Sequence, residues 1–322
     1  GIMLYLNKQD ISSLIVYDEV IKIIEKAMEI YEGKAFTMPD RITVNVSDTE
    51  TYLYMPCFTE SVKGTKVLTL NSENYKLKKP MLQGIMLLND AQSGEIKCIL
   101  DGASVTAYRT GAVGSTGIKY TSKESCKNLG IVGTGVQGLY QALYAASVRP
   151  LENIYVYDLD KKKCAEFANN LQSYLPKIKI QPTEDTAELV KKSEIIVTVT
   201  PSSSPVIPDD ESLLRGKHFV GIGSYKPNMR EYPESIYKLI DKVYIDVDFA
   251  AEESGDLITP LEKGWLKEEN IETLYSGIIN NNIDKSKTTF YKSVGMALFD
   301  ILVAEYIYKK AVEKNIGQKL QL

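Results

Sequence analysis

The stretch that decides the fold is Lys127-Asn128-Leu129-Gly130-Ile131-Val132-Gly133-Thr134-Gly135-Val136-Gln137-Gly138. A short apolar strand runs into a G-x-G-x-x-G loop, a helical pattern follows, and a second strand at 153–157 ends at Asp158. Such glycines permit a tight turn, close approach of the backbone to a pyrophosphate and close helix packing, and the helix N-terminus attracts phosphate. A ribose-binding acid is expected about 20 residues further on. The order of these parts predicts a dinucleotide-binding unit rather than a glycine-rich turn followed by a solvated acid.

From Leu129 onward, predicted strands alternate with helical patterns. The strands are expected at 129–133, 153–158, 176–180, 194–199, 217–222 and 242–246. This alternation indicates a parallel, doubly wound sheet of the Rossmann type.

Before about residue 120 the pattern is mostly antiparallel. An alternating strand at 42–46 is followed by a return strand at 52–55, a strand at 67–70 and a hairpin of 84–88 with 96–100. An amphipathic helix with Asp18 as N-cap and Gly33 just past its end precedes them. A long apolar helix starting near Val294 lies beyond the six-strand pattern. We therefore predict an α/β chain with a Rossmann domain at 119–290 and a mixed α+β domain, discontinuous in sequence, made of 1–118 and 291–322.

Composition sets limits on partners and location. The formal net charge of -4 gives no electrostatic footprint for nucleic acid or an anionic membrane. No apolar run approaches the ~20 residues of a membrane span, and the N-terminal residues turn polar too soon for a secretory signal. The four cysteines show no C-x-x-C spacing and are expected to be buried thiols in a reducing compartment. We expect a cytoplasmic protein that binds neither nucleic acid nor membrane.

A single histidine, His218, limits the possible chemistry. One histidine gives little support to Ser-His-Asp hydrolysis or Cys-His catalysis, and it cannot form a multi-histidine metal site. No metal site is predicted. His218 lies at the start of an expected strand, where a structural role is favoured. Proton chemistry would then use Lys, Asp, Glu, Tyr or water.

Three cations and one loop have two interpretations each. Arg109 stands off a stripe of small residues in the helix around 103–114, either as an exposed side chain or as a guanidinium aimed at a carboxylate or phosphate. Lys66 and Arg41 precede strands and are either solvated strand ends or part of an anion site. The loop Gly221-Ile222-Gly223-Ser224 either overhangs a nicotinamide or is a plain strand-to-helix turn.

Together these segments resemble the ornithine cyclodeaminase/mu-crystallin family. The matching residues, in chain order, are Arg41, Met55-Pro56, Lys66 with Asn71-x-x-Asn74, Thr106-x-x-Arg109-Thr110, Gly133-x-Gly135-x-Gln137, Asp158, Thr198-x-Thr200-Pro201-Ser202, Gly221-x-Gly223-Ser224, Pro227-x-Met229-Arg230-Glu231 and Lys292-Ser293-Val294-Gly295. The resemblance covers nearly the whole chain. It implies a Rossmann domain together with a domain that binds a small amino or imino acid and forms a homodimer.

The resemblance also implies site residues. Arg41, Lys66 and Arg109 would bind the substrate's α-carboxylate, with Lys66 and Arg109 as the catalytic pair and Lys66 also near the substrate nitrogen. The coenzyme-binding residues would be Thr110, Gly133, Gly135, Val136, Gln137, Asp158, Thr200 and Ser224. NAD(H) is favoured because Asp158 repels a 2′-phosphate, whereas Lys161-Lys162-Lys163 leave NADP(H) open.

Two departures from the family pattern guide the expected reaction. Family members that cyclise ornithine carry an Asp about where Ser224-Tyr225 stand here, and a Glu where Leu53 stands. We therefore predict an NAD(P)-dependent oxidoreductase of C–N bonds. It would reduce a cyclic α-imino acid, of the Δ1-pyrroline-2-carboxylate or ketimine type, to the L-amino acid in proline metabolism. The alternatives are an ornithine cyclodeaminase (a lyase that gives L-proline and ammonia and recycles NAD+), an alanine dehydrogenase-like enzyme, and non-catalytic binding of a small ligand as in mu-crystallin.

Overall fold

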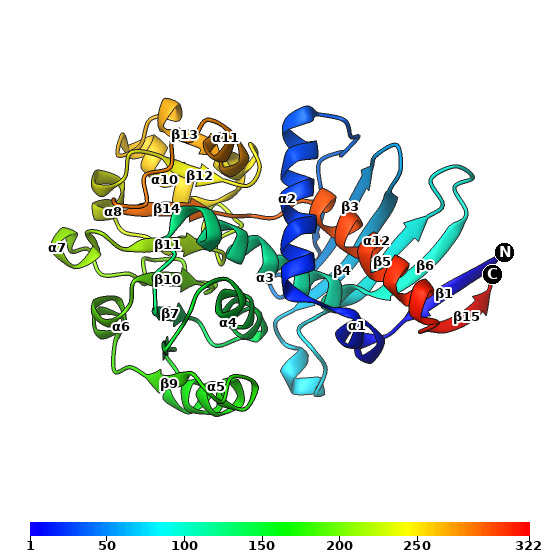
Figure 1. Ribbon diagram of the computed structural model, residues 1–322, viewed down its shortest axis with the longest axis horizontal. Helices are drawn as coiled ribbons and strands as arrows, with labels where there is room; N and C mark the ends of the chain where they lie inside the picture. Colours follow the sequence, from blue (N-terminus) through cyan, green and yellow to red (C-terminus); the bar gives the residue numbers. More distant parts are fainter. The chain divides into compact units, whose positions relative to one another are not determined.

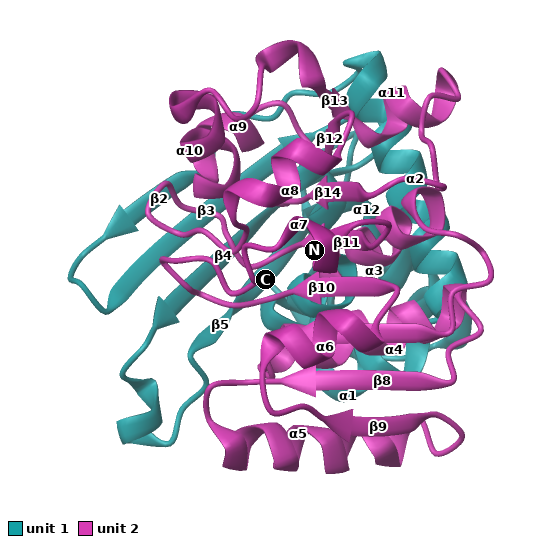
Figure 2. Ribbon diagram, turned by 90° about the vertical axis from the view of Figure 1, so that its left-hand side faces the viewer, with its two compact units in different colours: residues 1–109, 296–322 teal, residues 110–295 magenta.

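The computed structural model describes residues 1–322, and the chain divides into two compact units. Unit 1 comprises residues 1–109 and 296–322, and unit 2 comprises residues 110–295, as Figure 2 shows by colour. The chain passes from one unit to the other inside helix α3 (Gly102–Thr121) and again between Gly295 and Met296. The N-terminal unit is therefore discontinuous in sequence.

Unit 1 is built on a seven-stranded mixed sheet. Its order is β15 (Gln318–Gln321), β1 (Ile2–Leu6), β6 (Ile96–Asp101), β5 (Leu82–Asn89), β4 (Lys63–Asn71), β3 (Glu50–Phe58) and β2 (Ile42–Asn45). β1 runs parallel to β6, and every other neighbouring pair is antiparallel. The predicted antiparallel strands are confirmed, while β1 and β15 were missed. These two strands bring the ends of the chain side by side, with the Leu322 N–H donating to the Gly1 carbonyl at 3.2 Å.

Helices cover one face of this sheet. They are α1 (Lys8–Leu14), α2 (Tyr17–Gly33) and α12 (Ala297–Lys314), with a short 3-10 turn η1 at Asn74–Leu77. α12 packs against α2 and lies across β3, β4 and β5 (Figure 1). The expected caps of α2 were wrong by one or two positions. Its N-cap is Val16, and its C-cap is Lys34, which adopts the left-handed conformation with φ 58°. Asp18 lies in the first turn, where a negative charge still favours the helix.

Unit 2 contains an eight-stranded sheet in which every pair is parallel. Its order is β13 (Ile271–Thr273), β12 (Val243–Ile245), β14 (Thr289–Lys292), β11 (His218–Gly221), β10 (Ile195–Thr198), β7 (Asn128–Val132), β8 (Asn153–Tyr157) and β9 (Lys179–Pro182). The six predicted strands are confirmed. The third, expected at 176–180, is β9 and lies a few residues later in the chain, at Lys179–Pro182. β13 and β14 were not predicted, and β14 inserts between β11 and β12. The predicted fold class, an α/β chain with a Rossmann-type sheet and a second mixed domain, is confirmed.

The helices of unit 2 connect these parallel strands. They are α4 (Val136–Val148), α5 (Lys161–Tyr174), α6 (Thr186–Lys192), α7 (Glu211–Leu214), α8 (Glu234–Leu239), α9 (Ala250–Glu253), α10 (Gly255–Lys263), α11 (Leu274–Ile279) and the 3-10 turn η2 (Glu268–Asn270). From β7 the chain proceeds to β8 and β9 on one side, then returns to β10 and β11 on the other. In open parallel sheets such a switch point is where a ligand binds, beyond the carboxyl ends of the strands.

Two further expectations are confirmed. His218 is buried in β11 with its Nδ1 atom 2.8 Å from the Thr289 hydroxyl, and burial lowers its pKa to about 4. It is therefore neutral near pH 7 and structural. All four cysteines are buried and unpaired. No helix combines the length and the apolar character that crossing a membrane requires.

Candidate functional site

Two of the predicted cations meet one buried carboxylate in unit 1. Lys66 of β4 places its Nζ atom 2.9 Å from Oδ1 of Asp300, in the first turn of α12. Arg109 of α3 donates from Nε to the same oxygen at 2.7 Å. Lys66 is 1% exposed and Arg109 6%, so the solvated interpretation of both side chains is wrong. A carboxylate that accepts from two cations fixes both side chains in place.

Strand register brings the third cation into the same row. Met55 pairs with Lys66 across β3 and β4, and Ile42 pairs with Tyr54 across β2 and β3. Arg41, one residue before Ile42, therefore falls in line with Met55 and Lys66. Arg41 is half-buried, and its charge contributes to lowering the pKa of Lys66.

The electrostatics of this cluster favour an added anion. Burial is the main cause that lowers the pKa of Lys66 to about 7; Asp300 opposes this shift, while Arg109 and Arg41 add to it. Burial alone would raise the pKa of Asp300, but Arg109 and Lys66 outweigh it and hold that pKa below its usual value. The second Asp300 oxygen, Oδ2, is buried without a hydrogen-bond partner. Two cations on one carboxylate, with the charge of Arg41 acting on Lys66, leave an excess of positive charge, which suits a substrate carboxylate.

The glycine loop of unit 2 has the shape that a pyrophosphate requires. Gly133 has φ 112°, and a Cβ atom there would lie 2.5 Å from the Val199 carbonyl oxygen. A Cβ atom at Gly138 would meet the Gly133 carbonyl oxygen, so the helix packs close to the turn. Gly135, the N-cap of α4, has nothing within 4 Å of its Cβ direction, and Val136 beside it is exposed. The first-turn N–H groups of α4 have no partner within the helix, and the space beside Gly135 is open.

Gln137 and Asp158 flank this loop. The Oε1 atom of Gln137, in the first turn of α4, is buried without a partner. Asp158 follows the last residue of β8 and is half-buried; its Oδ2 accepts from the Thr134 N–H at 3.2 Å and hydroxyl at 2.7 Å. Asp158 thus stands beside the turn at the carboxyl edge of the sheet. Free helix N–H groups, the open face at Gly135 and an adjacent acid fit a dinucleotide with an unphosphorylated ribose.

The remaining predicted coenzyme residues also lie in unit 2. Thr110 accepts through its carbonyl from Gln141 Nε2 at 2.8 Å. Thr200 follows β10, and its N–H and hydroxyl both donate to Glu231. Ser224 follows β11; its hydroxyl is buried, donates to the Met229 carbonyl at 2.6 Å and lies 2.7 Å from the Ser254 hydroxyl. The Ser224 side chain is therefore fully engaged within the unit.

Sequence reasoning gave no role to a set of buried charges, although Glu231 and Lys292 were among the residues that match the family pattern. In unit 2, Glu231, Asp246, Asp256 and Lys292 are all 2% exposed or less. The Nζ atom of Lys292 donates to the carbonyls of Gly221 at 3.1 Å and Ser293 at 2.9 Å, and its charge acts on all three acids. Burial raises the pKa of Asp256 to about 7, against the effect of Lys292. In unit 1 the missed residue is Asp300. The sequence contained one signal for it, because Asp300 is an acid among the apolar residues of a long helix. Charged side chains are rarely fully buried without a partner, so such an acid predicts a buried cation beside it.

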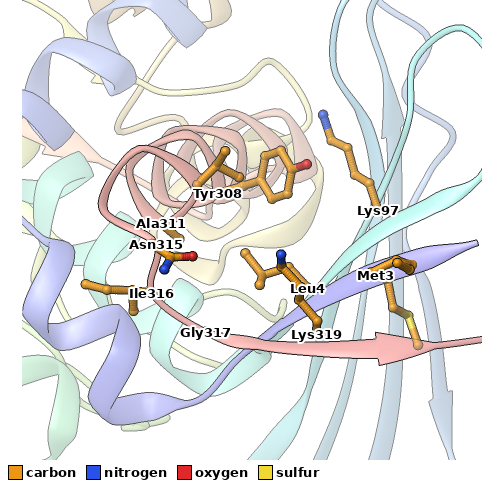
Figure 3. Close-up of a pocket in the computed structure, with 11 residues that line it drawn as sticks. Met3, Leu4, Lys97, Tyr308, Ala311, Asn315, Ile316, Gly317 and Lys319 are labelled. Atoms are coloured by element: carbon orange, nitrogen blue, oxygen red, sulfur yellow. The ribbon is translucent and has the colours of Figure 1, made fainter.

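A cavity of about 240 Å³ lies elsewhere in unit 1, beside β1, β15 and α12 (Figure 3). Its walls include Leu4, Lys97, Tyr308, Asn315 and Gly317. The Lys97 ammonium stands over the Tyr308 ring at 4.7 Å and is paired with Glu305 at 2.9 Å. None of Arg41, Lys66 and Arg109 lines it.

Comparison with known proteins gives one consistent result. The model of the ornithine cyclodeaminase/mu-crystallin family matches residues 3–315. A Δ1-pyrroline-2-carboxylate reductase from Bacillus cereus is 32% identical, over 99% of this chain and 100% of that protein. The structure of a Thermococcus litoralis Δ1-pyrroline-2-carboxylate reductase in complex with NADH and L-proline superposes with a TM-score of 0.90 at 30% identity, covering 98% of this chain and 99% of that one. An archaeal alanine dehydrogenase dimer with bound NAD gives a TM-score of 0.91 at 25% identity, with 100% of both chains covered.

Proposed function

Because the chain belongs to the ornithine cyclodeaminase/mu-crystallin family, we propose that it reduces a cyclic α-imino acid of the Δ1-pyrroline-2-carboxylate or ketimine type to the L-amino acid with NADH. The observation that carries the proposal is end-to-end similarity to reductases of that substrate, at 32% identity over 99% of the chain. The cationic cluster around Asp300 supports it, because an imino acid presents a carboxylate next to the reacting C=N bond. The proposed enzyme is an oxidoreductase of proline metabolism.

We assign substrate binding to unit 1. Arg41, Lys66 and Arg109 hold the α-carboxylate, and Asp300 keeps Lys66 and Arg109 at 2.9 and 2.7 Å from one oxygen. A substrate fixed through its carboxylate presents the C=N carbon in one orientation, which lowers the entropic part of the barrier. Lys66 also lies near the substrate nitrogen in this assignment. A protonated imine is already electrophilic, so the reaction requires no catalytic histidine.

We assign coenzyme binding to unit 2. Gly133, Gly135, Val136 and Gln137 receive the pyrophosphate, and Asp158 receives the ribose. Thr110 and Thr200 complete the site, together with Ser224, whose hydroxyl holds the loop after β11 in place. A reduced nicotinamide bound there would supply the hydride for the C=N carbon. NADH is preferred because Asp158 repels a 2′-phosphate, and Lys161, the first lysine after it in the chain, is exposed and paired with Glu184 at 3.2 Å.

The test is oxidation of NADH and NADPH in the presence of Δ1-pyrroline-2-carboxylate, followed at 340 nm, with L-proline measured as product. We expect turnover with each coenzyme when it is assayed on its own, and a higher rate with NADH than with NADPH. Ammonia release from L-ornithine without added coenzyme would instead identify a cyclodeaminase. NADH oxidation that requires pyruvate and ammonia would favour an alanine dehydrogenase, the activity of the archaeal relative.

The pKa of Lys66 predicts a pH dependence. The protonated ammonium holds the substrate carboxylate, and burial places the pKa of Lys66 at about 7 in the free enzyme. We therefore expect kcat/KM for the imino acid to fall as pH rises through 7, since kcat/KM reports groups of the free enzyme. In Lys66→Arg this limb of the pH profile should disappear, because a guanidinium stays charged. Lys63→Arg, on the same strand, should retain it; a limb that persists in Lys66→Arg would contradict the assignment.

We propose that unit 1 also forms a homodimer through its outer sheet face. Ile42, Tyr54 and Ile85 are exposed and lie in one row across β2 to β5, since Ile42 pairs with Tyr54, Tyr54 with Val67, and Val67 with Ile85. Such an exposed apolar row is typical of an interface. The structure of the archaeal alanine dehydrogenase relative is of a dimer. Val44, two residues after Ile42 on β2, is exposed as well. Analytical ultracentrifugation should give twice the chain mass, falling to one chain in Ile42→Glu/Val44→Glu; a monomeric wild type would contradict the proposal.

A further inference from the structure

A single buried carboxylate in unit 2 joins the two loops that follow β10 and β11. We propose that Glu231 is a positioning residue, which fixes these loops so that they receive the nicotinamide half of the coenzyme. The inference rests on the proposed coenzyme site and adds a residue to which no role has been given.

Glu231 uses both oxygens. Oε1 accepts from the Thr198 hydroxyl at 3.0 Å and from the Gly223 N–H at 2.9 Å. Oε2 accepts from the N–H and from the hydroxyl of Thr200, each at 2.8 Å. Thr198 and Thr200 belong to the end of β10 and its loop, whereas Gly223 belongs to the loop after β11. One side chain therefore ties two adjacent loops together through four hydrogen bonds.

The two loops are also closely packed against each other at Gly223. A Cβ atom at Gly223 would meet the backbone of Thr200 and would lie 2.8 Å from Glu231 Oε2. The loop after β11 therefore lies directly against the loop after β10. Glu231 itself is 0% exposed, so its oxygens are shielded from bulk solvent.

Burial raises the pKa of Glu231, and the groups around its carboxylate oppose that shift. All four of its partners are donors, and a hydrogen bond to an ionised group is stronger than a neutral one. Asp256 fixes the backbone on each side of the carboxylate by accepting from the N–H groups of Glu231 at 2.9 Å and Tyr232 at 3.0 Å. The buried Lys292 supplies the positive charge that acts on Glu231. A glutamine would place an NH2 group against N–H donors and lose part of this set.

The position of these two loops in the sheet indicates which part of the coenzyme they would contact. The glycine loop follows β7, and Asp158 follows β8 on one side of it. β10 and β11 lie on the other side of β7. Since the acid after β8 marks the adenosine ribose, the loops after β10 and β11 are where the nicotinamide half is expected.

The test compares two ligands in Glu231→Gln. NADH carries both halves of the coenzyme, whereas ADP-ribose lacks the nicotinamide. We expect the Kd of NADH, measured by fluorescence titration, to rise at least ~10-fold, because one or more charged hydrogen bonds are lost. The Kd of ADP-ribose should stay near the wild-type value, and the single-turnover rate of NADH oxidation should fall with the loss of NADH affinity. These readouts separate positioning from a general loss of stability.

Glu194→Gln is the matched control. Glu194 lies at the amino edge of the same sheet and accepts from the N–H groups of Lys127 at 2.8 Å and Asn128 at 3.2 Å. It should leave both Kd values unchanged. If Glu231→Gln does not fold, Thr198→Val removes one of the four bonds at a residue to which no coenzyme contact is assigned, and it should weaken NADH alone, to a smaller extent. Unchanged NADH binding and hydride transfer in these variants, or equal weakening of NADH and ADP-ribose, would overturn the inference. A wild-type protein that bound neither ligand would overturn the proposed coenzyme site itself.

Discussion

Replacing Arg109 with alanine is expected to lower kcat/KM for the imino acid by at least ~10²-fold, because the substrate carboxylate loses a charge-assisted hydrogen bond and a desolvated countercharge. The fold should persist, since Asp300 keeps Lys66 as a partner at 2.9 Å. Steady-state kinetics with varied imino acid and saturating NADH measure the loss. Circular dichroism and the thermal midpoint check the fold.

Two control variants sharpen this prediction. Arg109→Lys keeps the charge but loses the planar donor fork, so it should recover only part of the activity. Arg215→Ala removes an arginine whose side chain is 66% exposed and should leave kcat/KM unchanged. Normal turnover in Arg109→Ala would exclude Arg109 from the substrate site.

Replacing Asp300 with alanine is expected to have a large effect on stability as well as activity. Lys66 and Arg109 would remain buried without their common carboxylate, and breaking a buried ion pair from one side costs about 3–5 kcal/mol. We expect the free energy of unfolding to fall by about this amount. Activity should fall too, because neither cation would be held in place. Urea denaturation near pH 7 measures the first effect.

Glu313→Ala is the matched control for Asp300, because Glu313 is an exposed acid on the same helix. It should change the free energy of unfolding by no more than about 0.5 kcal/mol. Asp300→Asn, which keeps the shape and one acceptor, should lie between the wild type and Asp300→Ala. Wild-type stability in Asp300→Ala would show that the buried cations do not depend on this carboxylate.

Most of the fold could be predicted from local patterns. The G-x-G-x-x-G loop, the strand before it and Asp158 after the next strand predicted the parallel sheet, and the family resemblance is confirmed by a match over residues 3–315. The strands that were missed had weak local signals. β15 reads Gln-Lys-Leu-Gln and is held by pairing with β1, some 300 residues away in sequence, so its pairing rather than its composition makes it a strand.

The candidate site was only partly predictable, for a related reason. Cations such as Lys66 and Arg109 could be singled out by their positions next to a strand and a small-residue stripe. Their shared partner Asp300 is separated from Lys66 by 234 residues, and only the fold shows that α12 crosses β4. Glu231 likewise follows a strand in an ordinary polar loop. Its four hydrogen bonds depend on the adjacency of β10 and β11, which no local pattern contains.

The measurement that tests the central claim most directly is isotope transfer from NADH that carries deuterium at C4 of the nicotinamide, prepared with the label on either face. With Δ1-pyrroline-2-carboxylate as substrate, one of the two preparations should give L-proline with one deuterium at Cα, detected by mass spectrometry. Unlabelled L-proline from both preparations, or L-proline formed only from ornithine with release of ammonia, would contradict the assignment as an imino acid reductase.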